Sequence, residues 1–272
     1  MSSALVVFSG GQDSTAMLVR MLELKMPLDY AVFCDTGAEF DAMYCYLDFL
    51  DKWLQDNYNF KITRLSANKT YEDIVKQVMT DRAKEERIGR PKGITQVLGM
   101  DYCTRDLKVN VINKFCKQFD KVTHYNGYTY NEVLKNRGNA QEKMLDGFSY
   151  PLYNWKWNEP QIAGYLKEKC LFNPLYNHFT RTGCFLCPKQ SIKSWFMLWK
   201  NYNHHYEYAK TLEKWCDEND AVSKRFIYRK IAKIDRYEWV SLFDLEKEFK
   251  TKDNQKTFDF EDDMGDVSCH CK

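Results

Sequence analysis

The sequence predicts an α/β fold: a doubly wound parallel sheet followed by a C-terminal helical appendage. Short apolar runs of strand length alternate with segments of helical period over the first half of the 272-residue chain. Strands separated by helices pair in parallel through right-handed crossovers. From Ser191 onward, helical patterns rich in aromatic residues replace the strand-like runs. We therefore expect an α/β domain at 1–190, helices at 191–250 and a mobile acidic tail at 251–272.

The expected elements follow one another in a regular order. Residues 4–9 form a buried strand, and a helix over 13–25 ends before Pro27. The charged segment from Lys84 to Gly99 reads as a surface loop, because it carries Gly89, Pro91 and Gly93. The other expected elements are strands at 29–35, 60–65 and 121–127 and helices at 38–57, 71–84, 109–115, 191–214 and 221–249.

A glycine turn joins the first strand to the first helix, with the sequence Phe8-Ser9-Gly10-Gly11-Gln12-Asp13-Ser14-Thr15. Glycines without a Cβ allow a tight turn and a close approach of the backbone to a ligand. The helix start offers unpaired N–H groups and a positive dipole end, which suit phosphate oxygens. A carboxylate beside such a site indicates that Mg²⁺ accompanies the phosphates. The alternative is an ordinary capped helix start.

Residues 9–14, Ser-Gly-Gly-Gln-Asp-Ser, resemble the pyrophosphate loop (PP-loop) of the ATP pyrophosphatase, or adenine-nucleotide alpha-hydrolase-like, superfamily. In that superfamily the loop holds the β,γ-pyrophosphate of ATP while the α-phosphate is attacked. The loop is not a Walker loop, because no Gly-Lys-Ser/Thr follows at the required spacing. The resemblance implies that ATP and Mg²⁺ bind at residues 8–15.

A second turn carries the resemblance further. Asp35-Thr36-Gly37-Ala38-Glu39-Phe40 is similar to the end of the second strand in the phosphoadenosine phosphosulfate (PAPS) reductase-like branch of that superfamily. In this branch the turn lies near the adenosine. The resemblance implies that Phe33 and Cys34 give backbone contacts to adenine, with Asp35 and Thr36 beside them. Without the resemblance, the segment reads as a strand-to-helix turn with Thr36 as its cap.

Basic residues at two further places are implied to face the phosphates. In PAPS reductase-like proteins a Cys followed five residues on by Lys opens a helix, and Cys103 and Lys108 have this spacing here. The segment from Gly127 to Arg137 resembles one in which Gly starts a turn at the nucleotide and Arg contacts phosphate; the alternative is a surface arginine. The candidate catalytic residues are thus Asp13, Arg105, Lys108 and Arg137.

The resemblance extends over residues 4–190. Tyr150-Pro151-Leu152, Tyr165-Leu166, Asn173-Pro174-Leu175-Tyr176 and residues 181–188, Arg-Thr-Gly-Cys-Phe-Leu-Cys-Pro, follow the family pattern in order. Iron–sulfur reductases of the family carry two adjacent cysteines where this chain has Cys103 alone, and this difference argues against the usual four-cysteine cluster.

Three cysteines are candidate metal ligands. Cys184 and Cys187 place two thiolates on one turn, which fits Zn²⁺ or an iron–sulfur cluster, and Cys103 would be the third ligand. A reduced or redox-active thiol pair is the alternative. The choice between zinc and iron–sulfur stays open, and the candidates for a fourth ligand are Cys170, His178, Cys269 and Cys271. Burial is the simpler interpretation for Cys34, Cys45, Cys116 and Cys216.

Composition limits the compartment and the partners. The 40 Lys and Arg residues nearly balance 38 Asp and Glu residues, so net charge does not indicate a general nucleic-acid binder. Three kinds of partner remain compatible with this composition: a nucleic acid bound at a local basic patch, a sulfur carrier, and further copies of the same chain in a homo-oligomer. No run approaches the ~20 apolar residues of a membrane span, and the first apolar run lacks the basic start of a signal peptide. We expect a cytoplasmic protein with reduced thiols.

Two reactions fit the resemblance. The PP-loop implies cleavage of ATP between the α and β phosphates and adenylation of an acceptor, in sulfur activation or in nucleobase modification. The pattern from Asp35 to Cys187 also fits a sulfonucleotide reductase that releases sulfite through a cysteine thiol. Reductases bind no β,γ-pyrophosphate, and their Glu-Cys-Gly-Leu-His tail is absent from this chain, which ends in Cys269-His270-Cys271-Lys272. We favour ATP cleavage; a nucleotide-binding subunit of a larger complex is a third hypothesis.

Overall fold

The computed structural model describes residues 2–80, 83–94, 102–135, 147–230 and 236–255. Contacts between residues divide the chain into two compact units. Of the described residues, those up to 67 and from 106 to 183 form unit 1, and the others form unit 2. Residues 68–105 therefore belong with the C-terminal part of the chain rather than with the sheet. Their sequence position within the predicted α/β domain gave no sign of this.

Unit 1 is built on a five-stranded sheet with the strand order β3-β2-β1-β4-β5, in which every neighbouring pair is parallel. This arrangement confirms the predicted doubly wound parallel sheet. The chain proceeds in one direction from β1 to β3 and then crosses to the other side of β1 for β4, so the order reverses between β1 and β4. The strands are β1 (Ser2–Phe8), β2 (Tyr30–Asp35), β3 (Ile62–Ser66), β4 (Lys121–Tyr125) and β5 (Phe148–Ser149).

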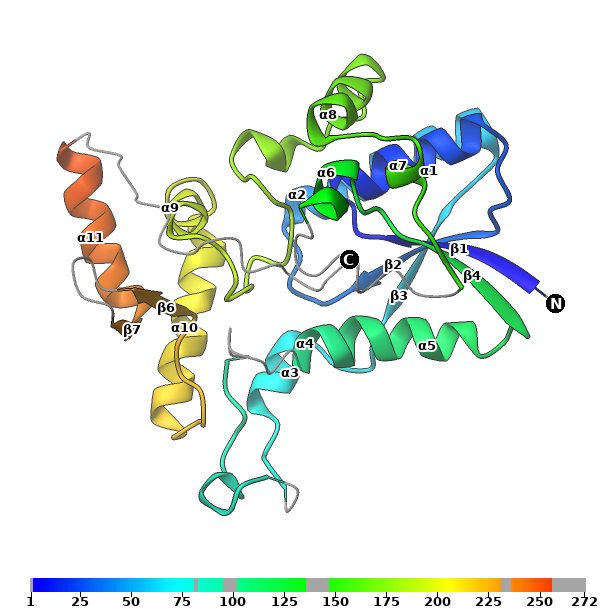
Figure 1. The fold of residues 1–272 in the computed structure, drawn as a ribbon. Coiled ribbons are helices and arrows are strands. Elements are labelled where there is room, and N and C mark those ends of the chain that lie inside the picture. The colour runs from blue at the N-terminus through cyan, green and yellow to red at the C-terminus, as the bar shows by residue number, and fades with distance from the viewer. Residues whose placement is uncertain (1, 81–82, 95–101, 136–146, 231–235, 256–272) are drawn as a thin grey trace. The chain divides into compact units, whose positions relative to one another are not determined.

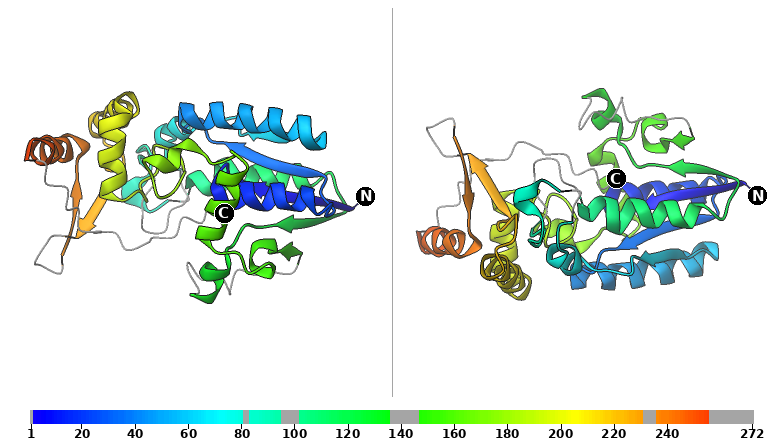
Figure 2. Two further views of the ribbon diagram at one scale, coloured as in Figure 1. Left: turned by 90° about the horizontal axis from the view of Figure 1, so that it is seen from above. Right: turned by 90° about the horizontal axis from the view of Figure 1, so that it is seen from below.

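Helices cover both faces of this sheet. α1 (Gln12–Glu23) lies on one face and α5 (Asn110–Cys116) on the other, as Figure 1 and the two views of Figure 2 show. Apolar residues of α5 pack against the buried side chains of β1 and β2, and α8 packs against α1. The other helices of unit 1 are α2 (Asp41–Tyr58), α6 (Tyr130–Leu134), α7 (Pro151–Asn154) and α8 (Glu159–Glu168), with a 3₁₀ turn at Pro174–Asn177.

Unit 2 contains helices and a small antiparallel sheet. Its helices are α3 (Tyr71–Lys76), α4 (Tyr102–Thr104), α9 (Ile192–Asn201), α10 (Asn203–Glu218) and α11 (Leu242–Gln255). β6 (Ile227–Lys230) pairs with β7 (Tyr237–Val240). The predicted helix over 221–249 is therefore wrong at these strands. Ile227 and Val240 are buried on one face of the hairpin, and Tyr237 and Trp239 are exposed on the other, which is the alternation of a half-buried strand.

The segment after α3 also differs from the prediction. The helix expected over 71–84 ends at Lys76, and an isolated bridge pairs Val78 with Pro91. Further on, Ile94 N donates to Ser223 O over 3.0 Å. At Gly93, φ is +76° and a Cβ would lie 1.8 Å from Ser223 O, so only glycine fits. Part of the predicted surface loop is thus hydrogen-bonded into unit 2, with a 3₁₀ turn at Glu85–Arg87.

The structure also bears on the expected tail, thiols and membrane segments. α11 continues to Gln255, five residues into the predicted tail, and Cys269 and Cys271 lie outside the described residues. Of the cysteines expected in apolar surroundings, Cys34 and Cys216 are buried, Cys116 is half-buried and Cys45 is exposed. Within the described ranges, no helix is both long and apolar enough to cross a membrane.

Candidate functional site

The glycine turn lies at the carboxyl edge of the sheet, where the strand order reverses. β1 has β2 on one side and β4 on the other, with Phe8 opposite Phe33 and Val6 opposite Tyr125. The ends of these three strands therefore lie side by side, as the sequence predicted for the loop after β1, the turn after β2 and the residues after β4. In open parallel sheets, ligands bind at this edge and at this kind of reversal.

Hydroxyl groups of the turn itself hold its shape. Ser9 N donates to Ser14 Oγ over 3.2 Å, and the two serine hydroxyls lie 3.0 Å apart. Ser14 Oγ donates in turn to Gly11 O over 3.1 Å. Gly10 has φ +73°, in the left-handed region that favours glycine. Each of these contacts lies within residues 9–14, so the residues of the turn themselves hold its shape.

The first turn of α1 is not capped in the ordinary way. Gly11 is the N-cap residue and makes no side-chain capping hydrogen bond, and Asp13 lies in the first helical turn. Helix N-termini leave backbone N–H groups without intrahelical partners, and these groups favour anions. The N-cap residue itself thus supplies no side-chain acceptor to the first amides of α1.

A distant segment, residues 173–182, contacts the turn. The side chain of Asn173 is fully buried, and its Nδ2 donates to Gly10 O over 3.0 Å. The hydroxyl of Tyr176 accepts a hydrogen bond from Gln12 N over 3.0 Å. A Cβ on Gly11 would lie 3.1 Å from Tyr176 Oη and 3.2 Å from Thr182 Oγ1. A site role for the side chains of Asn173, Tyr176 and Thr182 was not predicted. The signal for the first two is the Asn-Pro-Leu-Tyr pattern at residues 173–176.

Gly127 approaches the turn from the side of β4. A Cβ built on this glycine would lie 3.5 Å from Ser14 N and 3.6 Å from the carbonyl carbon of Asp13. The backbone after β4 therefore lies directly against the first turn of α1. The structure thus brings Gly127 together with residues 8–15, the neighbourhood that the sequence predicted for it.

The turn after β2 is organised by its own polar side chains. Asp35 Oδ1 accepts hydrogen bonds from Gly37 N over 2.8 Å and from Tyr44 Oη over 2.7 Å. The buried Thr36 hydroxyl donates to Glu39 Oε1 over 2.9 Å. These side chains shape the turn, which leaves the backbone at Phe33 and Cys34 as the predicted point of contact with adenine.

The thiol of Cys34 is a poor nucleophile in this position. Burial raises the pKa of Cys34 to about 11, and the ammonium group of Lys108 opposes that rise only in part. The thiol therefore stays protonated near neutral pH, and thiolates rather than thiols are the nucleophiles and metal ligands. Cys34 fits a packing role at the end of β2.

The predicted basic residues do not all fall in one unit. Lys108 belongs to unit 1, and its carbonyl oxygen lies 3.8 Å from Cys34 Sγ, beside the end of β2. Arg105 belongs to unit 2, where its guanidinium carbon lies 5.2 Å from the centre of the Tyr102 ring. Both residues lie in a π-helical turn, Arg105–Val109, a rare element that often occurs at functional sites. Arg137 lies outside the described residues.

The three predicted metal ligands all belong to unit 2 and are half-buried. Cys184 and Cys187 lie on one turn, in which Cys187 N donates to Cys184 O over 3.1 Å. Among the cysteines that the structure describes, no three Sγ atoms all lie within 4.8 Å of one another. The described thiols thus do not form a closed tetrahedral set, and the assignment of Cys103, Cys184 and Cys187 as metal ligands stays a prediction.

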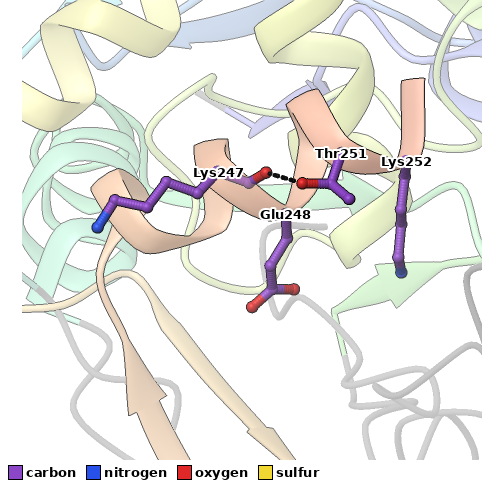
Figure 3. A pocket seen from close by; sticks show the side chains of 4 residues that line it. All are labelled: Lys247, Glu248, Thr251 and Lys252. Atoms are coloured by element: carbon purple, nitrogen blue, oxygen red, sulfur yellow. Dashed lines mark hydrogen bonds between the residues drawn. The ribbon is translucent and has the colours of Figure 1, made fainter. Parts of the chain in front are cut away.

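A surface pocket lies on α11, lined by Lys247, Glu248, Thr251 and Lys252, as Figure 3 shows. Thr251 Oγ1 donates to Lys247 O over 2.9 Å, and the Glu248 carboxylate binds Arg229 over 2.8 Å. All four residues come from one face of a single helix, and at least three of these side chains are already engaged, since Lys247 also pairs with Asp244 over 2.8 Å. We assign no function to this pocket.

Comparison with known proteins places these features in a family. A sequence model described as the phosphoadenosine phosphosulfate reductase domain matches residues 3–190. Two proteins of Methanocaldococcus jannaschii, "Uncharacterized protein MJ0066" and "Uncharacterized protein MJ0973", are 27% and 24% identical to this chain over 78% and 81% of its length. The alignments cover 40% and 47% of those proteins, so the chain spans less than half the length of these relatives.

A solved structure was also matched. The crystal structure of phosphoadenylyl-sulfate (PAPS) reductase from Candida auris, in complex with phosphate, has a TM-score of 0.41 and 16% sequence identity to this chain. The match covers 66% of this chain and 80% of the fungal one.

Proposed function

The chain belongs to the phosphoadenosine phosphosulfate reductase domain family, and we propose that it is an ATP-cleaving PP-loop enzyme of that family. In this proposal it binds ATP with Mg²⁺, breaks the bond between the α and β phosphates and adenylates an acceptor. The observation that carries the proposal is the glycine turn before α1, whose shape is held by its own hydroxyls and whose N-cap residue supplies no side-chain cap. Its place at the reversal of strand order supports nucleotide binding.

The residues of the turn have the chemistry to bind a pyrophosphate group. Backbone N–H groups at the start of α1 and the hydroxyls of Ser9 and Ser14 can donate to phosphate oxygens. Adenine would lie against the backbone of Phe33 and Cys34 at the end of the neighbouring strand. A nucleotide held at both places would cross the carboxyl ends of β1 and β2 and would present its α-phosphorus between them.

The proposed reaction is a substitution at the α-phosphorus. An acceptor oxygen forms a bond to that atom, the bond to the bridging oxygen of the β-phosphate breaks, and pyrophosphate leaves while the acceptor loses its proton to solvent. Lys108, beside the end of β2, is proposed to stabilise the negative charge that develops on the α-phosphate, with Arg105 and Arg137 as further candidates. The adenylated oxygen can then be displaced, with release of AMP, by a sulfur or nitrogen nucleophile.

The Asp13 side chain fits a role in holding Mg²⁺. It lies in the first turn of α1, and its Oδ1 atom is buried. Mg²⁺ prefers oxygen ligands and is usually bound through one or two carboxylates together with phosphates. When bound, the ion would offset the charge of the leaving pyrophosphate.

The second candidate is a sulfonucleotide reductase, and the family match itself favours it. In that reaction a thiolate attacks the sulfur of a phosphosulfate and the S–O bond to the nucleotide breaks. The resulting thiosulfonate then needs a second thiol, which forms a disulfide and releases sulfite. The tail thiols Cys269 and Cys271, which the sequence offers for this role, lie outside the described residues.

One experiment separates the two candidates. The purified protein is incubated with ATP and Mg²⁺, and separately with PAPS and a reduced thiol donor. Pyrophosphate and AMP in the first reaction are the expected result, with water attacking in place of the acceptor, because the proposal assigns the loop to the terminal phosphates. Sulfite in the second reaction, with no pyrophosphate in the first, would replace the proposal by the reductase. No product in either would favour a subunit whose chemistry needs a partner.

A further inference from the structure

The Tyr176 hydroxyl lies where the proposed function places a phosphate. It accepts the Gln12 backbone N–H over 3.0 Å at the start of α1. It also lies 3.1 Å from the point that a Cβ on Gly11 would occupy. Gln12 N–H belongs to the first helical residue, where a backbone donor has no partner within its helix. In this structure its partner is a side chain 164 positions further along the chain.

A phosphate oxygen and the Tyr176 hydroxyl compete for this donor. Both must lie about 3 Å from the nitrogen along the N–H direction, so they cannot occupy that position together. A charged oxygen forms a hydrogen bond roughly twice as strong as a neutral one. A bound pyrophosphate group would therefore take the place of the phenol.

The ring of Tyr176 packs against the ring of Phe172, with their centres 5.6 Å apart, and this contact does not depend on the hydroxyl. The ring is half-buried, and the turn that carries it is anchored by the buried side chains of Asn173 and Leu175. Thr182 Oγ1 lies 3.4 Å from Tyr176 Oη, so the hydroxyl has a second neighbour of suitable hydrogen-bonding chemistry.

From these contacts we propose that Tyr176 is a displaceable cap on the phosphate site: its hydroxyl satisfies the Gln12 amide and is displaced when the terminal phosphates of the nucleotide bind. This inference rests on the proposed function, because it requires that phosphates bind at the turn. It adds that a residue of the chain itself holds the donor that the phosphates would take. Nucleotide binding then includes the breaking of the bond between Tyr176 and Gln12.

The test is the affinity of Tyr176→Phe, which removes the hydroxyl and keeps the ring. The probes are inorganic pyrophosphate with Mg²⁺ and α,β-methylene ATP with Mg²⁺, each titrated calorimetrically. Because the variant has no cap to displace, it should bind both probes about fivefold more tightly than the wild type, the ratio that corresponds to one neutral hydrogen bond. The matched control is Tyr165→Phe, which removes a hydroxyl bonded to Glu23 Oε2 over 2.8 Å and should leave both affinities unchanged.

The outcomes separate this inference from the proposed function. If the wild type binds the probes and Tyr176→Phe binds them equally well, the contact is structural and the inference is wrong. Weaker binding by the variant would indicate that the Tyr176 hydroxyl binds the phosphate, and this result would also overturn the inference. If neither protein binds either probe, the proposed function fails and the cap fails with it. A second readout needs no variant: pyrophosphate should shift the Gln12 amide resonance of the wild type in NMR spectra, and an unmoved resonance would contradict displacement.

Discussion

Asn173 Nδ2 donates a hydrogen bond to the carbonyl oxygen of Gly10 over 3.0 Å, and the two residues are 163 positions apart in the sequence. Asn173 is fully buried, and its Oδ1 accepts from Leu175 N over 3.0 Å. One amide group therefore fixes both the glycine turn after β1 and the start of the segment that carries Tyr176. The shape of the candidate site depends on this long-range contact as well as on the turn's own residues.

Asn173→Ala should lower both stability and nucleotide cleavage. The change leaves the Gly10 carbonyl without this donor in a buried place, which costs about 1–3 kcal/mol in the free energy of unfolding. Pyrophosphate release from ATP should fall because residues 9–14 lose an anchor. Chemical denaturation and a pyrophosphate assay measure the two effects. Asn131→Ala, which removes an amide bonded to Glu159 Oε2 over 3.2 Å, is the control; an equal loss of pyrophosphate release there would contradict the assignment.

Gly10→Ala should destabilise the fold for two separate reasons. A non-glycine residue at φ +73° is strained by about 1–2 kcal/mol. In addition, the new Cβ would lie 2.5 Å from Met43 Sδ, which is buried. Gly164→Ala gives the opposite expectation, because that Cβ would lie in open space within α8 and should stabilise the helix by up to about 1 kcal/mol. Thermal unfolding of both variants should show shifts of opposite sign.

Asp13→Asn should abolish Mg²⁺-dependent pyrophosphate release and leave the fold intact. The substitution keeps the size of the side chain and removes the charge that a hard cation needs. Release is measured with ATP over a range of Mg²⁺ concentrations, with circular dichroism to check folding. Asp56→Asn removes an exposed carboxylate that pairs with Lys52 over 3.1 Å and should leave release unchanged. Normal release by Asp13→Asn would exclude this carboxylate from the mechanism.

The sheet and the glycine turn could be predicted because their signals are local. β1 and β2 contain short apolar runs, β3 alternates apolar and polar residues, and Gly10 lies where the backbone takes a positive φ. The strands are parallel because helices connect them, and the right-handed crossovers restrict the order of the strands in the sheet. Since a turn after a parallel strand emerges at the ligand-binding edge, the position of residues 9–14 followed from the same local patterns.

The missed features depend on contacts between distant residues. Arg90 donates to Asp220 O over 3.0 Å, and Gly93 pairs with Ser223, so residues 68–105 pack with the C-terminal part of the chain. A single long-range hydrogen bond, such as that from Gln12 N to Tyr176 Oη, has no repeating sequence pattern from which it could be predicted. The strands β6 and β7 are four residues each, too short to show a clear period of two, so the sequence pattern did not distinguish this hairpin from a helix.

Cys184→Ser tests whether the predicted ligands hold a metal. If Cys103, Cys184 and Cys187 bind zinc or an iron–sulfur cluster, this variant should lose most of the metal that copurifies with the wild type, because one thiolate is replaced by a weaker ligand. Elemental analysis and visible absorbance distinguish zinc from iron. Cys45→Ser, at an exposed cysteine, should keep the metal content of the wild type. A wild type that is fully active without metal would exclude the ligand assignment.

The buried carboxylate of Glu213 should make the protein less stable as pH rises. The side chain is 1% exposed and accepts hydrogen bonds from Phe226 N over 3.1 Å and from Leu242 N over 2.7 Å, which ties α10 to the residue before β6 and to the start of α11. Burial raises the pKa of Glu213 from 4.5 to about 7, against the lowering effect of those two bonds. The folded state therefore holds this proton at a higher pH than the unfolded state does.

The sign of the pH dependence follows from linkage. The stabilisation from the bound proton is complete below about pH 4.5 and is lost as pH rises through about 7, a loss of about 3 kcal/mol for a shift of this size. Unfolding by urea at pH values from 5 to 8 measures it. Glu213→Gln should reduce the slope across that window, since the amide does not titrate, and should cost stability at every pH because its NH₂ cannot accept a backbone N–H. Glu207→Gln, at an exposed carboxylate, should keep the wild-type slope; an unchanged slope in Glu213→Gln would assign the pH dependence to other groups.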